Sequence, residues 1–462
     1  MNKLPVAAAV SVVVILFGLP PAIGFVTEAR VRERIDDIDA GGMMSANVQS
    51  FDRGWFSSTA KIEFGVPPRY LPALAADPTA TTRVVVALHF AHGPIAMLDG
   101  VHLGWSKMVA RLDPEQPGVG ELSRQLGIPY LFEFRGRKGF SGAISFDADM
   151  PPIDLPVAEA RFQFSGAELS GTYAGSHLVA SAHADSLDFT SPTGTFAVRN
   201  LSARADNELL SQYVMPGAAE FSIERVFIVD ALRGQTPVFE GTNLRVASNT
   251  QLDEEGAAMQ MQVDYTLESL RVEDMEIAAA ALGLALRNID VAAVEAYADA
   301  ARDPAASDPR AMIETLTPQI DRALRANPSL TLDPMRFRLD GEAFDGRVEL
   351  SANPARLPPA GTLTLENPLL MLGFVNGSAE LRASKPLAQR LAKIAAQIQL
   401  GFDPSLPPDQ IEYMAEAQAG LTLTLLAGQG VLLEDGGDYR TSIRLDDGAL
   451  TLNGNSLPFG PL

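Results

Sequence analysis

The 462-residue chain contains no cysteine, only two tryptophans and only five histidines. The missing cysteines exclude disulfides, thiolate metal sites and cysteine nucleophiles. Basic residues are also scarce: 36 lysines and arginines face 57 acidic residues, a net charge of −21. So acidic a chain repels phosphate, so nucleic acid is not an expected partner. Electrostatic adhesion to anionic lipid headgroups is disfavoured for the same reason.

Long apolar runs are absent too, except at the start, where an uncharged apolar stretch extends from Leu4 to Val26. About 20 helical residues cross the hydrocarbon layer of a bilayer, so this stretch predicts a membrane anchor. Pro20 and Pro21 would kink or end the helix, and small residues at 22–24 could instead form a signal-peptidase site. The stretch can be a retained anchor or a cleaved signal peptide, and in both cases the rest of the chain is exported. The predicted anchor residues are Val6, Val10, Val14, Leu16, Phe17 and Leu19.

A stalk helix is expected directly after the apolar stretch, over residues 28–39. Val31, Ile35 and Ile38 are spaced four and three residues apart among charged residues, which is typical of an amphipathic helix. Gly41 and Gly42 would end it. Residues 1–42 are therefore predicted to form a membrane anchor and stalk helix.

Apolar and polar residues alternate through most of the body, as from Met259 to Leu267, which predicts strands with one apolar and one wet face. Turns rich in Asp, Gly and Pro join these runs, so neighbouring strands are expected to be antiparallel. Residues 43–285 are predicted to be a β-rich region outside the cytoplasm. The alternation at Leu421, Leu423 and Leu425 predicts a further strand.

Helical patterns are few and lie mostly in residues 286–462, which are predicted to form an α+β region continuing the sheet. Capping residues, among them Asn288 and Ser384, and apolar stripes predict helices near residues 121–126, 288–302, 307–324, 384–398 and 408–419. The predicted fold class is α+β: mainly antiparallel β-sheet with a few helices, plus one N-terminal transmembrane or signal-anchor helix.

The residues show no constellation that carries chemistry. His89 and His92 are spaced like metal ligands, but an odd separation on a strand points them to opposite faces. His177 and His183 would lie about 20 Å apart on an extended strand. No nucleophile elbow, zinc-protease helix, phosphate loop or dinucleotide fingerprint is present in the sequence. We therefore assign no catalytic, metal or cofactor-binding residue and expect no cofactor.

Three segments in this order resemble a known family: residues 51–58 around an Arg-Gly-Trp-Phe turn, residues 92–94, and residues 450–455 near the C-terminus. With the apolar start, the chain resembles the YdgA-like family of bacterial envelope proteins, whose function is largely uncharacterised. The resemblance implies a single-pass inner-membrane protein with a periplasmic body and no enzyme activity. The shared landmarks are predicted fold determinants: Arg53, Gly54, Phe56, His92, Gly93, Pro94, Asn453 and Gly454.

Physical reasons support that interpretation of the landmarks. Arg53 can anchor a carboxylate beside the close turn at Gly54, and Gly93 with Pro94 can break a strand. Asn453 with Gly454 is a strong hairpin signal.

The leading hypothesis is a non-enzymatic, membrane-anchored envelope protein that acts as a scaffold or interaction partner. Its expected partners are the inner membrane, through the N-terminal helix, and another envelope protein or lipid. The alternative is lipid binding or transfer on the apolar face of a curved β-sheet. A dispersed hydrolase site is a third option, for which a histidine and two carboxylates would have to converge in a cleft. We expect the apolar faces to be mostly sealed; a long open trough would favour the lipid alternative.

Overall fold

The computed structural model describes residues 20–36, 38, 44–67, 82–211, 213–234, 236–302, 309–363, 372–400 and 407–457. The chain divides into two compact units, residues 1–209 and residues 210–462, called the first and second unit below. The predicted domain limit between residues 285 and 286 falls inside a strand, Met275–Asp290. Antiparallel sheet dominates both units, which confirms the predicted α+β class with mainly antiparallel strands.

The first unit is an antiparallel sheet in the order β1-β2-β3-β6-β7-β8-β11-β12-β13. A small ribbon, β9 with β10, pairs with the far end of β12, and β4 pairs only with β5. Its elements are β1 (Ser45–Arg53), β2 (Ser57–Val66), β3 (Thr82–His92), β4 (Ile95–Met97), β5 (Val101–Leu103), β6 (Ser106–Leu112), α2 (Val119–Leu126), β7 (Glu133–Lys138), β8 (Ile144–Met150), β9 (Ile153–Val157), β10 (Ala160–Phe164), β11 (Ala167–Ala174), β12 (His177–Ser191) and β13 (Gly194–Glu208).

A helix over residues 20–36 packs on this sheet. Its residue Ile35 is 6% exposed and joins a cluster with Ile62 of β2 and Leu88 and Phe90 of β3. Val31 packs against the same cluster. The apolar residues whose spacing predicted a stalk helix therefore pack against the sheet and cover part of one face of the first unit.

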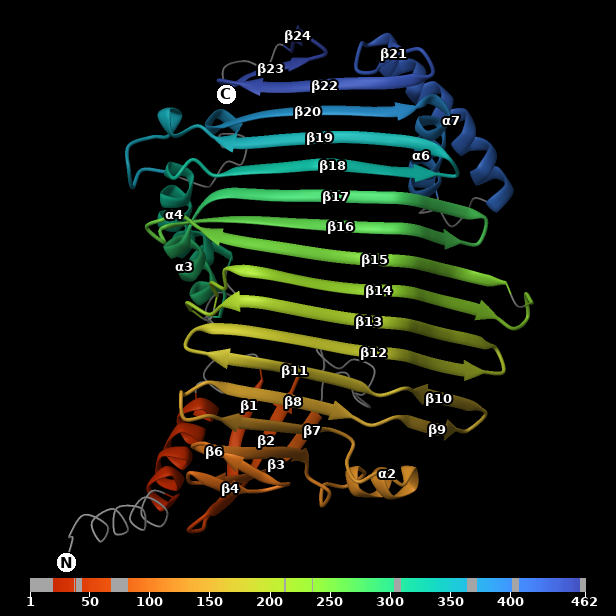
Figure 1. Cartoon of the computed structure of the whole chain (residues 1–462). Helices are drawn as coiled ribbons and strands as arrows, with labels where there is room; N and C mark the ends of the chain where they lie inside the picture. Colours follow the sequence, from red (N-terminus) through yellow and green to blue (C-terminus); the bar gives the residue numbers. More distant parts are fainter. Residues whose placement is uncertain are drawn as a thin grey trace, which may run out of the picture. The chain divides into compact units, whose positions relative to one another are not determined.

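The second unit is an antiparallel meander in the order β14-β15-β16-β17-β18-β19-β20-β22-β23-β24, with β21 on β22 (Figure 1). Its strands are β14 (Gly217–Asp230), β15 (Pro237–Leu252), β16 (Ala258–Val272), β17 (Met275–Asp290), β18 (Ser329–Leu339), β19 (Glu342–Ala352), β20 (Val375–Ser384), β21 (Leu433–Asp435), β22 (Asp438–Asp446), β23 (Ala449–Leu452) and β24 (Asn455–Ser456). Short 3-10 turns are η3 (Pro354–Arg356) and η4 (Leu372–Phe374).

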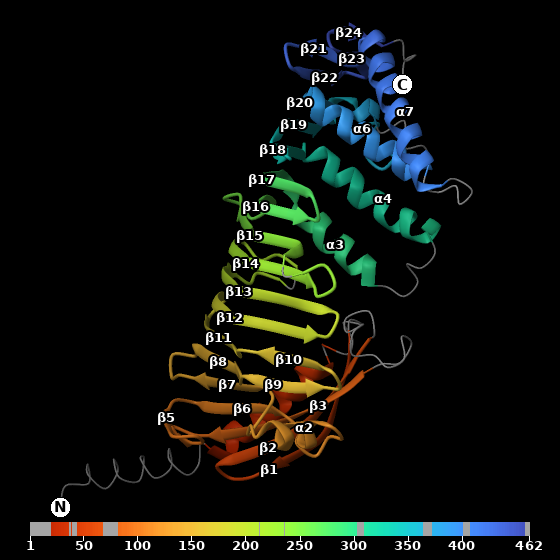
Figure 2. The same cartoon turned by 90° about the vertical axis from the view of Figure 1, so that its right-hand side faces the viewer.

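Two helix pairs flank this meander. α3 (Val291–Arg302) follows β17 directly, and α4 (Pro309–Arg325) precedes β18. α6 (Lys385–Leu400) follows β20, and α7 (Pro408–Gly428) follows α6 in the chain. Because β17 and β20 run in opposite directions, the two pairs lie at opposite ends of the strands, and Figure 2 shows all four helices on the same side of the sheet.

A line of irregular backbone crosses the long strands. Asn243 of β15 and Ala279 of β17 have left-handed backbone, with φ of 50° each. The apolar series of β16 changes phase at the same row, from Val263, Tyr265 and Leu267 to Leu270 and Val272. Left-handed residues interrupt the two-residue alternation and bend strands, and Figure 1 shows the strands bending along their length.

The helix predictions hold in position, with one exception at the C-terminal side. Leu421, Leu423 and Leu425 lie in α7, so the strand predicted there is wrong. Leucine is a strong helix former, and a helix that has already begun extends through it at little cost. The predicted cap Ser384 is present: its hydroxyl accepts the Leu387 N–H at 3.3 Å. At α3 the cap is Asp290 and not Asn288, since Asp290 accepts the Ala293 N–H at 2.8 Å.

The predicted anchor residues Val6, Val10, Val14, Leu16, Phe17 and Leu19 lie outside the described residues. Among the helices that the structure describes, none is both long enough and apolar enough to span a membrane.

Candidate functional site

Apolar side chains form continuous rows across the sheet of the second unit. One row runs through directly paired residues of five consecutive strands, and a second runs beside it. The first row is Phe221, Val246, Tyr265, Leu282 and Met335, and the second is Val263, Leu284, Leu332 and Val348. Paired residues of antiparallel strands share a face, so these rows make up one surface, called the apolar face below.

The apolar face is open. Large apolar residues on six sheet positions remain between 37% and 42% exposed; they are Phe221, Ile228, Tyr265, Leu282, Leu350 and Ile443. Among apolar residues in the described strands of this unit, only Leu339 and Ala352 are buried. The expectation that the apolar faces are mostly sealed is therefore wrong for the second unit. The physical reason is that, among the residues the structure describes, no second layer covers the middle of the strands.

The helices border the apolar face at the two ends of its strands and do not cover its centre. Leu316 of α4 and Leu387 of α6 are buried at opposite ends of the sheet. Met275, at the start of β17, lines a hollow of about 550 Å³ together with Pro386, Ile394 and other residues of α6 and α7. The helices thus stand on the side of the sheet to which Met275 contributes, and they leave the centre of the strands uncovered.

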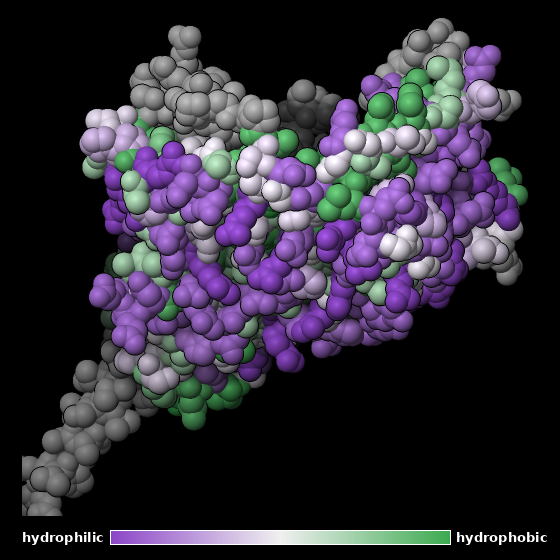
Figure 3. Space-filling model, turned by 90° about the horizontal axis from the view of Figure 1, so that it is seen from above, coloured by the Kyte–Doolittle hydropathy of each residue, from purple (hydrophilic) through white to green (hydrophobic). Residues whose placement is uncertain are grey.

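The opposite face of the same strands is polar. Thr266, Ala281, Arg336 and Asp345 are paired in one row, one residue out of phase with Tyr265 and Leu282. Ion pairs cross this face, including Arg245 with Glu220 at 2.8 Å. In Figure 3 hydrophilic residues cover most of the outer surface, whereas hydrophobic residues gather toward the side where the helices project. The sheet is therefore amphipathic, with its apolar side toward the helices.

Glycines deepen the apolar face. A Cβ added to Gly346 would lie 2.8 Å from Met335 Cε and 2.9 Å from Leu381 Cδ2. A Cβ at Gly241 would lie 3.2 Å from Val226 Cγ1. Neighbouring side chains already lean over these glycines, so larger residues would displace them.

The size of the face suits an acyl chain. The two rows together cross six strands, β14 to β19, which pair in sequence. At about 4.8 Å between strands they span roughly 24 Å. One leaflet of a bilayer has a hydrocarbon depth of about 15 Å, half of the full layer. The rows can therefore accommodate extended hydrocarbon along their whole length.

The landmarks near the N-terminus gather around the helix of residues 20–36. Arg53 Nη1 lies 2.7 Å from Glu28 Oε2, and its guanidinium stacks 3.7 Å from the Phe25 ring centroid. The carboxylate anchor predicted for Arg53 is thereby confirmed. The close turn predicted at Gly54 is also confirmed, because a Cβ there would meet the Ser57 carbonyl oxygen at 2.7 Å.

His92 and Gly93 hold the start of the same helix. Gly93 has φ of 111°, and a Cβ there would lie 2.9 Å from Pro20. β3 ends at His92 and β4 begins after Pro94, which confirms the predicted strand break. His92 Nε2 lies 2.8 Å from Ser58 Oγ, and a Cβ on Gly24 would lie 3.4 Å from the same nitrogen.

The Ser58–His92 pair has the spacing of a nucleophile with its base, but it is sealed inside the first unit. Ser58 is 2% exposed and His92 is 1% exposed. Burial lowers the pKa of His92, and among the described residues its Nδ1 has no hydrogen-bond partner and therefore no acid that orients the ring. The pair serves to pack the helix start rather than to reach a substrate.

The C-terminal landmark forms the predicted hairpin. β23 and β24 pair across Asn453 and Gly454, both with left-handed backbone. The Asn453 side chain accepts the Ser442 N–H at 2.7 Å and donates to the Gly430 and Val431 carbonyls at 2.7 and 2.9 Å. Asn453 therefore fastens the end of α7 to the last strands.

One polar hollow in the first unit collects the groups required by the hydrolase hypothesis. Its volume is about 480 Å³, and its lining includes His183, Asp147 and Asp149. Asp147 is already paired with Arg135 and Arg137, and Tyr130 donates to Asp149 at 2.9 Å. His183 bonds Asp185 at 2.7 Å. Among the described residues, no hydroxyl that lines this hollow forms a hydrogen bond with His183. The contact between a base and a nucleophile that hydrolysis would require is therefore missing.

No group of histidine and acidic side chains in the described ranges is arranged to hold a metal ion. His89 is exposed on β3 while His92 is buried at its end, and His177 bonds Asp206 at 2.6 Å.

Comparisons with known proteins place the chain among uncharacterised bacterial proteins. A family model described as "Bacterial protein of unknown function (DUF945)" matches residues 1–459. Protein YdgA of Escherichia coli (strain K12) is 23% identical over 353 residues, which cover 71% of this chain and 67% of that protein. No solved structure matches the chain significantly.

Proposed function

The chain belongs to the DUF945 family of bacterial proteins of unknown function, as its resemblance to the YdgA-like family predicted, and from this premise we propose that it binds lipid. The proposed site is the apolar face of the second unit, and the proposed ligand is the acyl part of a membrane lipid. Binding or transfer of lipid requires no bond-making, so the protein acts without catalysis in this proposal.

The observation that carries this proposal is the exposure of the apolar face. Contiguous apolar surface of more than a few hundred Å² is rare on soluble monomers and marks an interaction site. Here it spans several strands, ends at helical walls and backs onto a polar, ion-paired face. An exposed surface made mainly of apolar side chains favours hydrocarbon and not one particular headgroup.

The location belongs to the same proposal. The apolar residues from Leu4 to Leu19, which precede the helix packed on the first unit, would hold the chain at the bacterial inner membrane with its body in the periplasm. There the apolar face would meet lipids that leave or enter the bilayer. This placement rests on the sequence and on the family resemblance.

Contact with another envelope protein, the scaffold hypothesis, is a second proposal that one feature favours. α7 exposes Tyr413, Leu421 and Leu425, whose spacing in steps of four places them on one helix face. An apolar helix face of this kind fits a groove on a partner.

Mass spectrometry of lipids that co-purify with the detergent-extracted full chain tests the lipid proposal. We expect phospholipid to accompany the wild-type protein. Tyr265→Asp and Leu282→Asp each place a carboxylate on the apolar face and should lower bound lipid about tenfold, since an unpaired charge against hydrocarbon costs more than 1.4 kcal/mol.

The matched control is Thr266→Asp, one residue along the same strand on the polar face. We expect its lipid content to equal that of the wild type. Equal lipid in all three variants, or none in the wild type, would refute the proposal.

A further inference from the structure

The β4–β5 hairpin of the first unit has its apolar side outward. Ile95 pairs with Leu103 and Met97 with Val101, and all four side chains are exposed, Met97 by 77%. Ala96, on the other side of the ribbon, is 1% exposed. Two-stranded ribbons in soluble proteins normally turn their polar side to the solvent, because apolar side chains stabilise a fold only when they are removed from water.

More exposed apolar residues continue from this hairpin. Gly93 N donates to the Trp105 carbonyl at 3.2 Å, and the Trp105 ring meets Phe140 edge-on at 5.8 Å between centroids. His92 N donates to the Phe56 carbonyl at 2.7 Å, which brings the turn of Trp55 and Phe56 to the same place. We call this surface the hairpin patch: Trp55, Phe56, Ile95, Met97, Val101, Leu103, Trp105 and Phe140.

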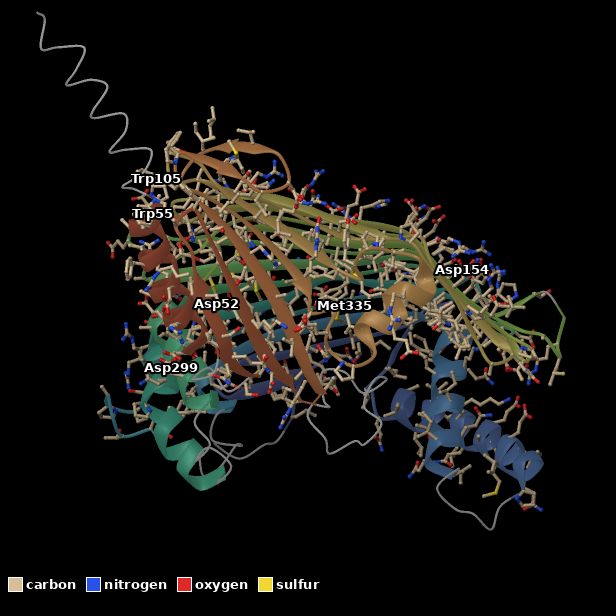
Figure 4. All side chains as sticks on the ribbon, turned by 90° about the horizontal axis from the view of Figure 1, so that it is seen from below. Asp52, Trp55, Trp105, Asp154, Asp299 and Met335 are labelled. Carbon is tan, nitrogen blue, oxygen red and sulfur yellow. The ribbon has the colours of Figure 1, made fainter. Side chains whose placement is uncertain are left out.

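Both tryptophans of the chain lie in the hairpin patch. Figure 4 labels Trp55 and Trp105 close to each other in the first unit. Trp105 Nε1 donates to the Phe140 carbonyl at 3.2 Å, so its polar edge is satisfied while its ring remains partly exposed. Tryptophan of this kind is typical of the boundary between water and hydrocarbon.

The end of the apolar N-terminal stretch is fixed against the same site. Pro20 packs on Gly93, Gly24 lies beside His92, and Phe25 stacks with Arg53. Phe25 and Val26 are themselves 59% and 53% exposed. The residues that precede Pro20 in the sequence are apolar back to Leu4, so a bilayer that takes up this stretch would lie next to the hairpin patch.

We propose that the hairpin patch inserts into the interfacial layer of the bilayer that holds the N-terminal stretch. Its partner is the lipid surface, recognised through apolar and aromatic side chains and not through charge. The net charge of −21 agrees with this, since an acidic chain gains nothing from anionic headgroups. Insertion here is independent of lipid binding in the second unit.

Tryptophan fluorescence, excited selectively over that of tyrosine, reports on this patch alone, because Trp55 and Trp105 are the two tryptophans of the chain. The full chain is reconstituted into phosphatidylcholine vesicles with or without bromine on the upper acyl carbons. We expect brominated lipid to quench about half of the emission, as for tryptophan at the bilayer interface. Trp55→Phe and Trp105→Phe separate the two contributions.

The double substitution Met97→Asp and Val101→Asp changes a cross-strand pair of the hairpin and should reduce the quenching by brominated lipid several-fold. The matched control is Leu232→Asp, which alters an apolar residue that is 88% exposed in the second unit; it should quench like the wild type. Emission that brominated lipid leaves unchanged, with tryptophans that soluble acrylamide still reaches, would overturn the proposal. Tryptophans shielded from both quenchers would identify a protein, such as a second copy, as the occupant and would overturn it equally.

Discussion

Individual residues of the first unit connect the N-terminal helix to the sheet. The landmarks Arg53, His92 and Gly93 lie within contact distance of the helix residues Pro20, Gly24 and Glu28. The sequence predicted the carboxylate anchor at Arg53, the close turn at Gly54 and the strand break at Gly93, because each residue has a backbone or charge property with one structural use. Their common partner could not be predicted, since nothing local in residues 20–36 shows that the helix lies on the sheet.

His92 makes stability depend on pH. Burial lowers its pKa below the ordinary value of 6.5, so the unfolded chain binds a proton below that pH and the folded chain resists it. Stability from this group is therefore intact above pH 6.5 and is lost as the pH falls. We expect the free energy of unfolding to decrease by up to about 1.4 kcal/mol per pH unit below 6.5, because one proton is involved.

The measurement is urea unfolding between pH 7.5 and pH 5. His92→Gln, which keeps a polar group for Ser58 but cannot titrate, should flatten this pH dependence. His89→Gln removes an exposed histidine of the same strand and should leave it unchanged. An identical pH slope in wild type and His92→Gln would show that the buried ring does not control it.

At the scale of elements, alternation and turn chemistry predicted most strands and the final hairpin correctly. The prediction erred where two periods coincide, in α7, because leucines in alternating positions also suit a helix. Which apolar face stays open could not be predicted at all. Val263 and Leu284 form part of an open row, whereas similar alternation around Ile62 and Leu88 is sealed by a helix.

The side chain of Asn453 joins the end of α7 to the last strands through hydrogen bonds. Asn453→Ala removes one accepted and two donated hydrogen bonds and places a Cβ-bearing residue without a polar side chain at φ of 52°. We expect a loss of about 2 to 4 kcal/mol in the free energy of unfolding. Asn453→Gly tolerates the backbone and should lose about 1 kcal/mol less.

Far-UV circular dichroism during urea unfolding gives these values. Asn455→Ala, two residues away and exposed, is the control and should stay near the wild type. An Asn453→Ala protein as stable as the wild type would mean that the end of α7 is held by other contacts.

At the scale of the whole molecule, the central feature is an amphipathic sheet whose apolar face is left uncovered by the described residues. Apolar rows that stay exposed to water gain stability when a ligand or membrane covers them, so the rows across β14 to β19 are typical of an interaction surface. The two proposed lipid contacts differ in kind: the hairpin patch meets a bilayer surface, whereas the apolar face takes individual chains. Each can fail without the other.

The apolar face is tested most directly by photocrosslinking in cells with p-benzoylphenylalanine at position 265, where it replaces an exposed aromatic residue. The account predicts a phospholipid adduct at position 265 and none at position 266, whose side chain lies on the polar face. Equal labelling at both positions, or an adduct at 265 that contains only protein, would contradict it.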